Sequence, residues 1–213
     1  MKDNKFSLVI VDVQKDFYDS SGALYVNGAE KLPPKIYEFI HKNHDVIGEI
    51  IYTLDWHNPD NESFKENGGP WPSHCVKGTW GVNPAYPIEF VANKYNIPLR
   101  FYKKGQVIDE YGAFPHYYRN NEENTMYGEN WPDYKENLIT TKYEKFIVCG
   151  LCGDYCVLET IKNLKKIPGV EVYAATDLIL SIDNGAKFWK WVDENTKQLE
   201  YLKVFGDYEL LKI

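Results

Sequence analysis

The chain has 213 residues, of which 44% are hydrophobic and 26% are charged, and its formal net charge is −7. This composition is ordinary for a globular protein, and the excess of acidic residues argues against nucleic acid or an anionic membrane as a partner. A chain of this length can bury a sizeable core, so we expect a single domain over residues 1–213.

The apolar and cysteine patterns indicate where the protein works. No stretch approaches the 18 apolar residues of a membrane-spanning helix, and the first apolar run is too short for a signal peptide. Three of the four cysteines lie within residues 149–156, which does not resemble a disulfide framework. We therefore expect a cytoplasmic protein with reduced thiols.

The first expected element is a strand over residues 6–11 (FSLVIV), a continuous apolar run typical of a central parallel strand. It ends at Asp12. Ligands of open α/β sheets bind outside the carboxyl ends of the strands, so Asp12 is a candidate site residue; a helix cap or solvated turn carboxylate is the alternative. Phe17, in the loop that follows, could reach back over the strand ends.

A helical pattern over residues 32–44 leads into a second strand, over residues 46–54. Asp55 and His57 follow that strand directly, and His74 lies in the loop beyond, which is rich in Gly, Pro, Asn and Ser. Aspartate and histidine are suitable ligands for zinc, iron or manganese. An ordinary hydrogen bond within the loop is the alternative.

The same loop carries further candidates. Glu62 and Glu66 could supply another metal ligand. Trp71 is either a core residue or the wall of a pocket for a flat ligand.

A helix over residues 85–95 and a third strand over residues 99–102 come next, followed by Lys103 and Lys104. Lysines at such a position are usually solvated, but one held beside Asp12 would pair with the acid and tune a nearby thiol. Residues 106–135 are polar, aromatic and irregular, and too long for an ordinary connection. We expect this segment to cover the active site, with its His116 at the surface.

The most informative stretch is KFIVCGLCGDYCVLET, residues 145–160. Its apolar start predicts a buried strand, and Asp154 is expected to cap a helix that places Cys156 in the first turn. A helix N-terminus stabilises a thiolate and offers backbone N–H groups to an oxyanion, so Cys156 is the candidate nucleophile. The alternative is a small residue packed at a crowded turn.

The remaining pattern completes an α/β architecture. We expect a helix over residues 135–143, strands over 170–175 and 199–205, a helix over 183–195 and a short C-terminal helix. The alternation of strands and helices predicts a mostly parallel sheet of about six strands with helices on both faces.

Five stretches together match a known pattern: VDVQKDF at 11–17, DWHNPDNESF at 55–64, GPWPSHCVKGTWG at 69–81, KKGQVIDEYGAF at 103–114 and GLCGDYCV at 150–157. In this order they resemble the isochorismatase-like cysteine hydrolases and, within them, the nicotinamidase/pyrazinamidase branch. The resemblance implies that Asp12 is the general base, that Lys104 completes the triad and that Cys156 is the nucleophile.

The resemblance also implies a metal site and a pocket. Asp55, His57 and His74 match the ligands of one divalent metal ion, with zinc expected and iron or manganese as alternatives. Glu66, Glu62 or Ser63 is the candidate for a fourth ligand. Phe17 and Trp71 match the aromatic walls, and a non-proline cis peptide is expected between Leu151 and Cys152.

Two residues depart from the family pattern at the pocket. Cys152 stands where a small residue such as Ala is usual, and Tyr155 precedes the nucleophile. We count both as candidate substrate-binding residues, because they could alter the shape of the pocket and the choice of substrate.

The implied reaction is hydrolysis of nicotinamide to nicotinate and ammonia through a cysteine thioester, a step of NAD salvage, with pyrazinamide as a further substrate. The metal would bind the pyridine nitrogen and fix the ring. Another amidase of the superfamily, acting on carbamoyl or ureido compounds, is one alternative. A structural metal site or redox relay built from Cys149, Cys152 and Cys156 is another, and a non-catalytic binding protein is a third. A homo-oligomer is left open by analogy.

Overall fold

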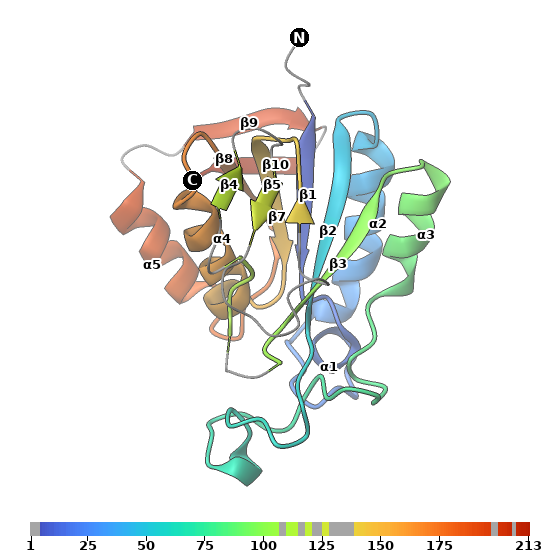
Figure 1. Ribbon diagram of the computed structural model, residues 1–213, viewed down its shortest axis with the longest axis vertical. Coiled ribbons are helices and arrows are strands. Elements are labelled where there is room, and N and C mark those ends of the chain that lie inside the picture. The colour runs from blue at the N-terminus through green and yellow to red at the C-terminus, as the bar shows by residue number, and fades with distance from the viewer. Residues whose placement is uncertain are drawn as a thin grey trace.

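The computed structural model describes residues 5–106, 110–114, 118–120, 125–127, 139–196, 200–205 and 208–213 (Figure 1). Its main sheet has seven strands in the order β3-β2-β1-β7-β8-β10-β9. These strands are β1 (Phe6–Val11), β2 (Ile47–Asp55), β3 (Leu99–Lys104), β7 (Lys145–Gly150), β8 (Glu171–Ile179), β9 (Glu200–Phe205) and β10 (Tyr208–Lys212). A second, three-stranded sheet consists of β4 (Tyr118–Asn120), β5 (Thr125–Tyr127) and β6 (Ile139–Thr140).

Most of the main sheet is parallel, as the sequence predicts. β1 lies between β2 and β7 and pairs in parallel with both, and the parallel pairing continues to β3 and β8. β10 runs antiparallel to both of its neighbours, β8 and β9. The carboxyl ends of β1, β2, β3 and β7 therefore meet at one edge of the sheet.

Helices cover both faces of this sheet, which confirms the predicted architecture (Figure 1). Leu8 and Ile10 of β1 point into the core shared with one pair of helices, whereas Val9 and Val11 point into the core shared with the other pair. The first pair is α2 (Leu32–Asn43) and α3 (Tyr86–Lys94), and the second is α4 (Leu158–Lys165) and α5 (Ala186–Asn195). This alternation explains why β1 is apolar throughout. Among the described residues, the other helical elements are the short α1 (Lys15–Tyr18), two 3-10 turns (Ala29–Lys31 and Lys65–Asn67) and a π-helical turn (Gly153–Val157).

The C-terminus is a strand rather than the short helix expected, and the main sheet therefore has seven strands instead of about six. Leu210 and Leu211 of β10 are both fully buried, one in each of the two cores. Consecutive residues can reach opposite faces of a sheet only from a strand. In the segment expected to be helical over 135–143, residues 139–140 form β6 and residues 141–143 are irregular.

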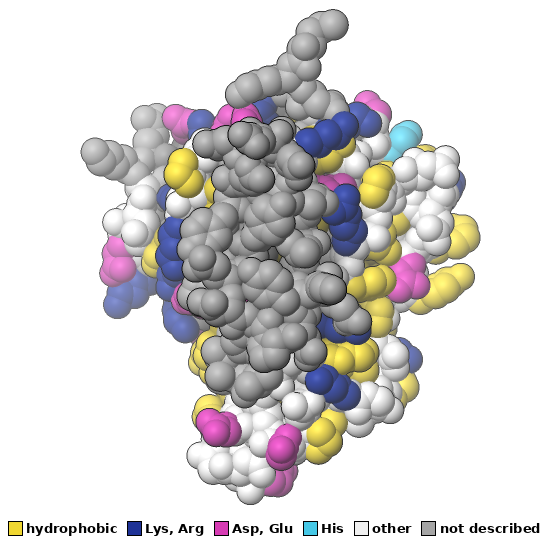
Figure 2. Space-filling model, viewed as in Figure 1, with side chains coloured by type: hydrophobic (Ala, Val, Ile, Leu, Met, Phe, Trp, Pro, Cys, Tyr) yellow, Lys and Arg dark blue, Asp and Glu magenta, His cyan; other side chains and the backbone are white. Residues whose placement is uncertain are grey.

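The face of the molecule shown in Figure 2 carries charged side chains of both signs. In Figure 2, basic and acidic side chains are scattered around the described part of this face rather than gathered into a basic stripe. No helix among the described residues is long and apolar enough to cross a membrane. Much of the expected active-site cover, including His116, lies outside the described residues.

Candidate active site

Asp12, Lys104 and Cys156 meet at the carboxyl edge of the sheet. Asp12 follows β1, Lys104 ends β3, and Cys156 lies in the π-helical turn after β7. Lys104 Nζ is 2.7 Å from Asp12 Oδ2 and 3.5 Å from Cys156 Sγ. All three side chains are buried, so a carboxylate, an ammonium and a thiol share one space that excludes bulk water.

The backbone of Asp12 turns out of β1 to present its carboxylate. Its φ is +48°, in the left-handed region that Asp tolerates better than most residues. Its N–H donates to the Thr53 carbonyl at 3.2 Å, and the Thr53 hydroxyl donates to Asp12 Oδ1 at 2.6 Å. One carboxylate oxygen is thus held by β2, and the other faces Lys104.

The turn that carries Cys156 differs from the one the sequence predicts. The peptide bond between Leu151 and Cys152 is cis, as expected, but the residues after it form a π-helical turn, and α4 begins only at Leu158. Asp154 does not cap the helix. Its carboxylate accepts hydrogen bonds from the N–H groups of Ile182 and Asp183, at 3.1 and 3.2 Å. It therefore ties the turn of the cysteine to the loop after β8, because those backbone donors need a partner.

Burial and the charges of neighbouring side chains shift the pKa of all three triad residues. Burial raises the pKa of the Cys156 thiol well above its ordinary value, against the opposing effect of the Lys104 ammonium. Burial also raises the pKa of Asp12, and Lys104 again opposes. The pKa of Lys104 itself is raised well above its ordinary value, because Asp12 and Asp55 outweigh the burial that would lower it. A buried thiol thus lies beside a carboxylate made more basic than usual, with a fixed cation next to both.

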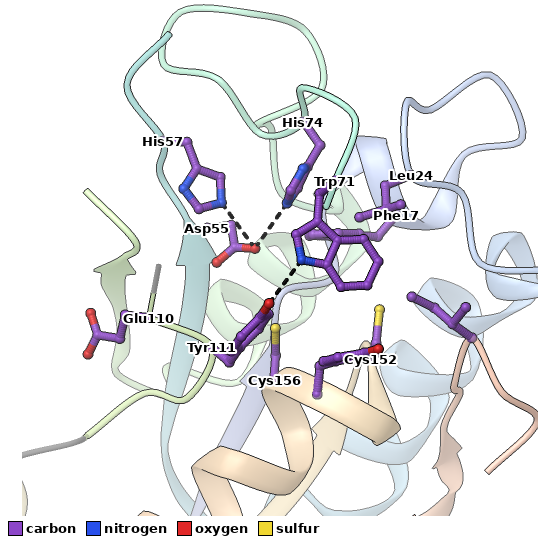
Figure 3. A pocket seen from close by; sticks show the side chains of 12 residues that line it. Phe17, Leu24, Asp55, His57, Trp71, His74, Glu110, Tyr111, Cys152 and Cys156 are labelled. Atoms are coloured by element: carbon purple, nitrogen blue, oxygen red, sulfur yellow. Dashed lines mark hydrogen bonds and ion pairs between the residues drawn. The ribbon is translucent and has the colours of Figure 1, made fainter. Parts of the chain in front are cut away.

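A second group, made of Asp55, His57 and His74, lies beside the triad (Figure 3). The Nε2 atoms of His57 and His74 are 3.5 and 3.7 Å from Asp55 Oδ2. The opposite ring nitrogens, Nδ1, lie 2.7 Å from the Gly105 carbonyl and 2.8 Å from the Pro72 carbonyl. A carbonyl only accepts, so each Nδ1 carries a proton, and each Nε2 is the ring nitrogen that faces the Asp55 carboxylate.

This donor set fits a divalent cation. The two Nε2 atoms and Asp55 Oδ2 lie close together, and two imidazole nitrogens with a carboxylate oxygen are donors that a divalent cation accepts. Imidazole rings oriented by carbonyl acceptors at Nδ1 are the usual arrangement around zinc and similar metals.

The candidates for a fourth ligand differ in their placement. The Ser63 hydroxyl is buried and lacks a hydrogen-bond partner among the described residues. Glu62 and Glu66 are exposed, and the Glu66 carboxylate accepts a hydrogen bond from Ser73 at 3.0 Å. The structure does not bring Glu66 to the group formed by Asp55, His57 and His74.

Asp55 belongs to both groups. Its Oδ2 faces the two imidazoles, while Oδ1 accepts a hydrogen bond from Lys104 Nζ. Although burial acts to raise the pKa of Asp55, the Lys104 ammonium holds it well below its ordinary value. Asp55 is therefore a carboxylate, with one oxygen available to a metal.

Cys156 and the group formed by Asp55, His57 and His74 face one pocket, which has about 360 Å³ of empty space, part of it open to solvent. The four predicted substrate-binding residues all line it: Phe17, Trp71, Cys152 and Tyr155. The lining also includes Asp55, His57, His74 and Cys156, together with Leu24, Glu110, Tyr111 and Ile182. Cys149 is not among the lining residues and is buried in the core beside α2 and α3.

Aromatic side chains from three separate segments meet at this pocket (Figure 3). Trp71 Nε1 donates a hydrogen bond to Tyr111 Oη at 2.9 Å. The Tyr155 ring lies edge-on to Trp71, with centroids 5.1 Å apart, and 5.5 Å from the Tyr111 ring. The three rings provide flat walls suited to an aromatic ligand.

Comparisons with known proteins agree with this geometry. The nicotinamidase of Acinetobacter baylyi is 29% identical over 206 residues, which cover 88% of this chain and 87% of that protein. The pyrazinamidase of Pyrococcus horikoshii in complex with zinc is 26% identical, with a TM-score of 0.65 over 89% of this chain and 95% of the other. PnC1 from L. infantum in complex with nicotinate is 25% identical, with a TM-score of 0.65 over 90% and 88%. No protein-family model matches the chain.

The chain is a homologue of the nicotinamidases and pyrazinamidases. The similarity to this branch is therefore not confined to five short stretches but extends over most of the chain and to the fold.

Sequence reasoning missed some pocket residues of this nicotinamidase homologue. Glu110 and Tyr111 belong to the segment expected to cover the site, but nothing in the neighbouring sequence distinguishes them as pocket residues rather than surface residues. Burial raises the pKa of Glu110 to about 7, so this carboxyl is an unusual acid at the pocket. Leu24 and Ile182 also line the pocket, but they lie in irregular turns, and the spacing of apolar residues does not predict the path of such turns.

Proposed function

We propose that this protein is a nicotinamidase, which hydrolyses nicotinamide to nicotinate and ammonia through a thioester on Cys156. The observation that carries the proposal is the position of Lys104, whose ammonium contacts Asp12, Asp55 and Cys156 at once. This single contact network brings a nucleophile and base within reach of a group suited to a metal, in a pocket with aromatic walls. The names of the homologues support the same reaction.

The first half of the reaction uses Asp12 as the base. The Asp12 carboxylate takes the proton of Cys156 Sγ, and the thiolate forms a bond to the carboxamide carbon. The N–H groups of Cys152 and Cys156 hold the oxyanion in this proposal. Asp12 then gives its proton to the amide nitrogen, the C–N bond breaks, and ammonia leaves a thioester on Cys156.

The second half uses the same acid again. Asp12 takes a proton from water, the hydroxide attacks the thioester carbon, and the C–S bond breaks. Asp12 then returns its proton to Cys156 Sγ, which restores the thiol, and the nicotinic acid leaves and loses its own proton to solvent to become nicotinate. Lys104 keeps its charge throughout and stabilises the negative charge wherever it lies, on Asp12 or on the sulfur.

The metal site orients the substrate in this proposal. Asp55, His57 and His74 would hold one divalent ion, with zinc expected and iron or manganese as alternatives. The buried Ser63 hydroxyl, which lacks a hydrogen-bond partner among the described residues, is the candidate for a further ligand. The bound ion supplies a Lewis-acid position for the pyridine nitrogen. Phe17 and Trp71 flank the ring, and Cys152 and Tyr155 shape the pocket around the amide.

The proposal extends to substrate range and cellular role. Pyrazinamide differs from nicotinamide by one ring nitrogen and keeps both the amide and a ring nitrogen, so we propose it as a second substrate. The reaction would serve NAD salvage in the cytoplasm, and cell fractionation with an antibody to the protein tests that compartment.

Ammonia release from nicotinamide tests the proposal directly. Purified protein is assayed as prepared, after chelation, and after return of zinc, iron or manganese. We expect release that chelation abolishes and one of the metals restores. If nicotinamide is inert and a carbamoyl or ureido amide is hydrolysed instead, the Asp12, Lys104 and Cys156 chemistry stands and the substrate assignment is wrong.

A further inference from the structure

Gln14 is a fully buried polar residue that the reaction does not use and that does not line the pocket. Its side-chain carboxamide makes three hydrogen bonds, all to backbone groups. Nε2 donates to the carbonyls of Asp55 and Val82, at 2.8 and 2.9 Å, and Oε1 accepts from the N–H of Asp55 at 2.8 Å. The carboxamide thus binds both backbone groups of Asp55.

These bonds replace a missing part of the sheet. The parallel register of β1 and β2 ends at Val11 and Thr53, because the chain turns away at Asp12. The backbone of Asp55, two residues beyond Thr53, therefore lacks a strand partner on that side. The Gln14 carboxamide has the donor and acceptor of a peptide group and takes the vacant place, so the buried backbone of Asp55 stays paired.

Asp55 is held on its other side by β3, where it is in register with Lys104. It is consequently fixed between the Gln14 side chain and a strand. A side chain that must point one oxygen at Lys104 and the other at His57 and His74 needs a backbone fixed in this way, because a small rotation of the carboxylate would spoil both sets of contacts.

We propose that Gln14 is the positioning residue that sets Asp55 between the metal and the Lys104 ammonium. It acts through the backbone of Asp55 and touches neither the metal nor the substrate. The inference rests on the metal site of the proposed function, but it does not depend on which amide the protein hydrolyses.

The test compares Gln14→Met with Asn43→Leu in metal-free protein titrated with cobalt(II). The first change keeps the length of the side chain and removes its hydrogen bonds. The second is a matched control, because Asn43 is also buried and donates from its side-chain amide to a backbone carbonyl, that of Phe39 at 2.8 Å. The Asn43 carbonyl accepts a hydrogen bond from the Val46 N–H, and the Val46 carbonyl accepts one from the N–H of Phe6 at the start of β1. The control residue therefore lies at the opposite end of the sheet.

We expect Gln14→Met to weaken cobalt binding by about 10- to 100-fold, the usual loss when a residue that orients a metal ligand is removed. The visible absorption bands of the bound cobalt should shift as well, because the ligand geometry changes. The affinity and spectrum of Asn43→Leu should match the unmodified protein. Circular dichroism establishes that each variant is folded.

A folded Gln14→Met protein with unchanged cobalt affinity and an unchanged spectrum would overturn the inference. If that variant does not fold, Gln14→Glu takes its place, since it keeps an acceptor for the Asp55 N–H and loses the two donated bonds. Weaker cobalt binding by Gln14→Glu, together with a shifted absorption spectrum, would support the inference. Failure of both variants to fold while Asn43→Leu folds would assign Gln14 a structural role only. Cobalt binding is measured without substrate. Its result therefore remains valid even if the protein does not hydrolyse nicotinamide.

Discussion

The two halves of the site are built differently. Asp12, Lys104 and Cys156 stand at the ends of strands or in the turn that follows one, so the register of the sheet sets their separation. His57 and His74 lie in the loop after β2, and single hydrogen bonds to carbonyls orient their rings. The triad is thus fixed by the core, whereas the metal-binding half depends on local contacts that a bound ion would complete.

Asp55 and Lys104 join the two halves. Asp55 is the only member of the group formed with His57 and His74 that ends a strand, and its carboxylate meets the Lys104 ammonium. A change at the join should affect both halves, whereas a change on either side should affect one. The predictions below test this difference.

Replacement of Cys156 by Ala should remove the chemistry and leave the metal half intact. We expect amide turnover to fall by at least about 10³-fold, because the thioester no longer forms. Cobalt affinity should stay within about twofold, since the thiol is not among the proposed ligands. Steady-state ammonia release and a cobalt titration measure the two quantities; a parallel loss of metal binding would contradict the division into halves.

Replacement of Lys104 by Met should damage both halves. The buried carboxylates of Asp12 and Asp55 lose their common cation, and removing one partner of a buried ion pair costs about 3–5 kcal/mol of stability. Urea denaturation measures this loss. Lys103→Met is the matched control, because Lys103 is only partly buried and its ammonium lies over the Trp56 ring at 4.5 Å. We expect it to cost about 1 kcal/mol or less; equal losses would rule out the special role of Lys104.

Replacement of His74 by Ala should affect the metal half alone. We expect cobalt affinity to fall by about 10- to 100-fold, while iodoacetamide still alkylates Cys156 at nearly the unmodified rate. Mass spectrometry of the alkylated peptide follows the second quantity. A large change in thiol reactivity would show that the triad is not held by the sheet independently of the loop.

Replacement of Tyr111 by Phe should have a smaller effect, on binding. It removes the hydrogen bond from Trp71 Nε1 and keeps the aromatic ring. Loss of one such bond is worth about 1 kcal/mol, so KM for nicotinamide should rise by roughly fivefold with kcat nearly unchanged. A fall in kcat with constant KM would indicate instead that Tyr111 acts on the reacting atoms.

The pH dependence of stability should identify Glu110. Burial raises its pKa from 4.5 to about 7. Between these values the folded protein keeps a proton that the unfolded chain has released, so stability falls as the pH rises through this window. Glu110→Gln should flatten that part of the curve, by up to about 3 kcal/mol. Urea denaturation at several pH values measures the slope, and an unchanged slope would show that Glu110 does not titrate there.

The contrast between the halves also explains what the sequence could predict. Strand ends can be read from apolar runs, so Asp12, Lys104, Asp55 and the turn with Cys156 could be placed at one edge of the sheet before the structure was known. Positions in irregular loops could not. Glu66 and Ser63 are three residues apart, and only the folded loop shows that the first is exposed and the second buried.

Predictions from local residue preferences were wrong where a tertiary contact outweighed those preferences. Asp154 is a good helix cap by type, yet it binds the loop after β8. Leu210 and Leu211 are adjacent in sequence, which is compatible with a helix. The structure shows that they pack into cores on opposite faces of the sheet, which requires a strand. Gln14 lies within one of the matching stretches, but its role depends on where β1 diverges from β2, and the pattern of apolar residues does not show that point.

Ammonia release from nicotinamide by metal-replete protein, measured side by side for the unmodified chain and Cys156→Ala, tests the central claim most directly. The account predicts rapid release by the unmodified protein and almost none by the variant, with both proteins folded and both able to bind cobalt. Comparable release by the two proteins would contradict it, because the amide would then be hydrolysed without a thioester on Cys156.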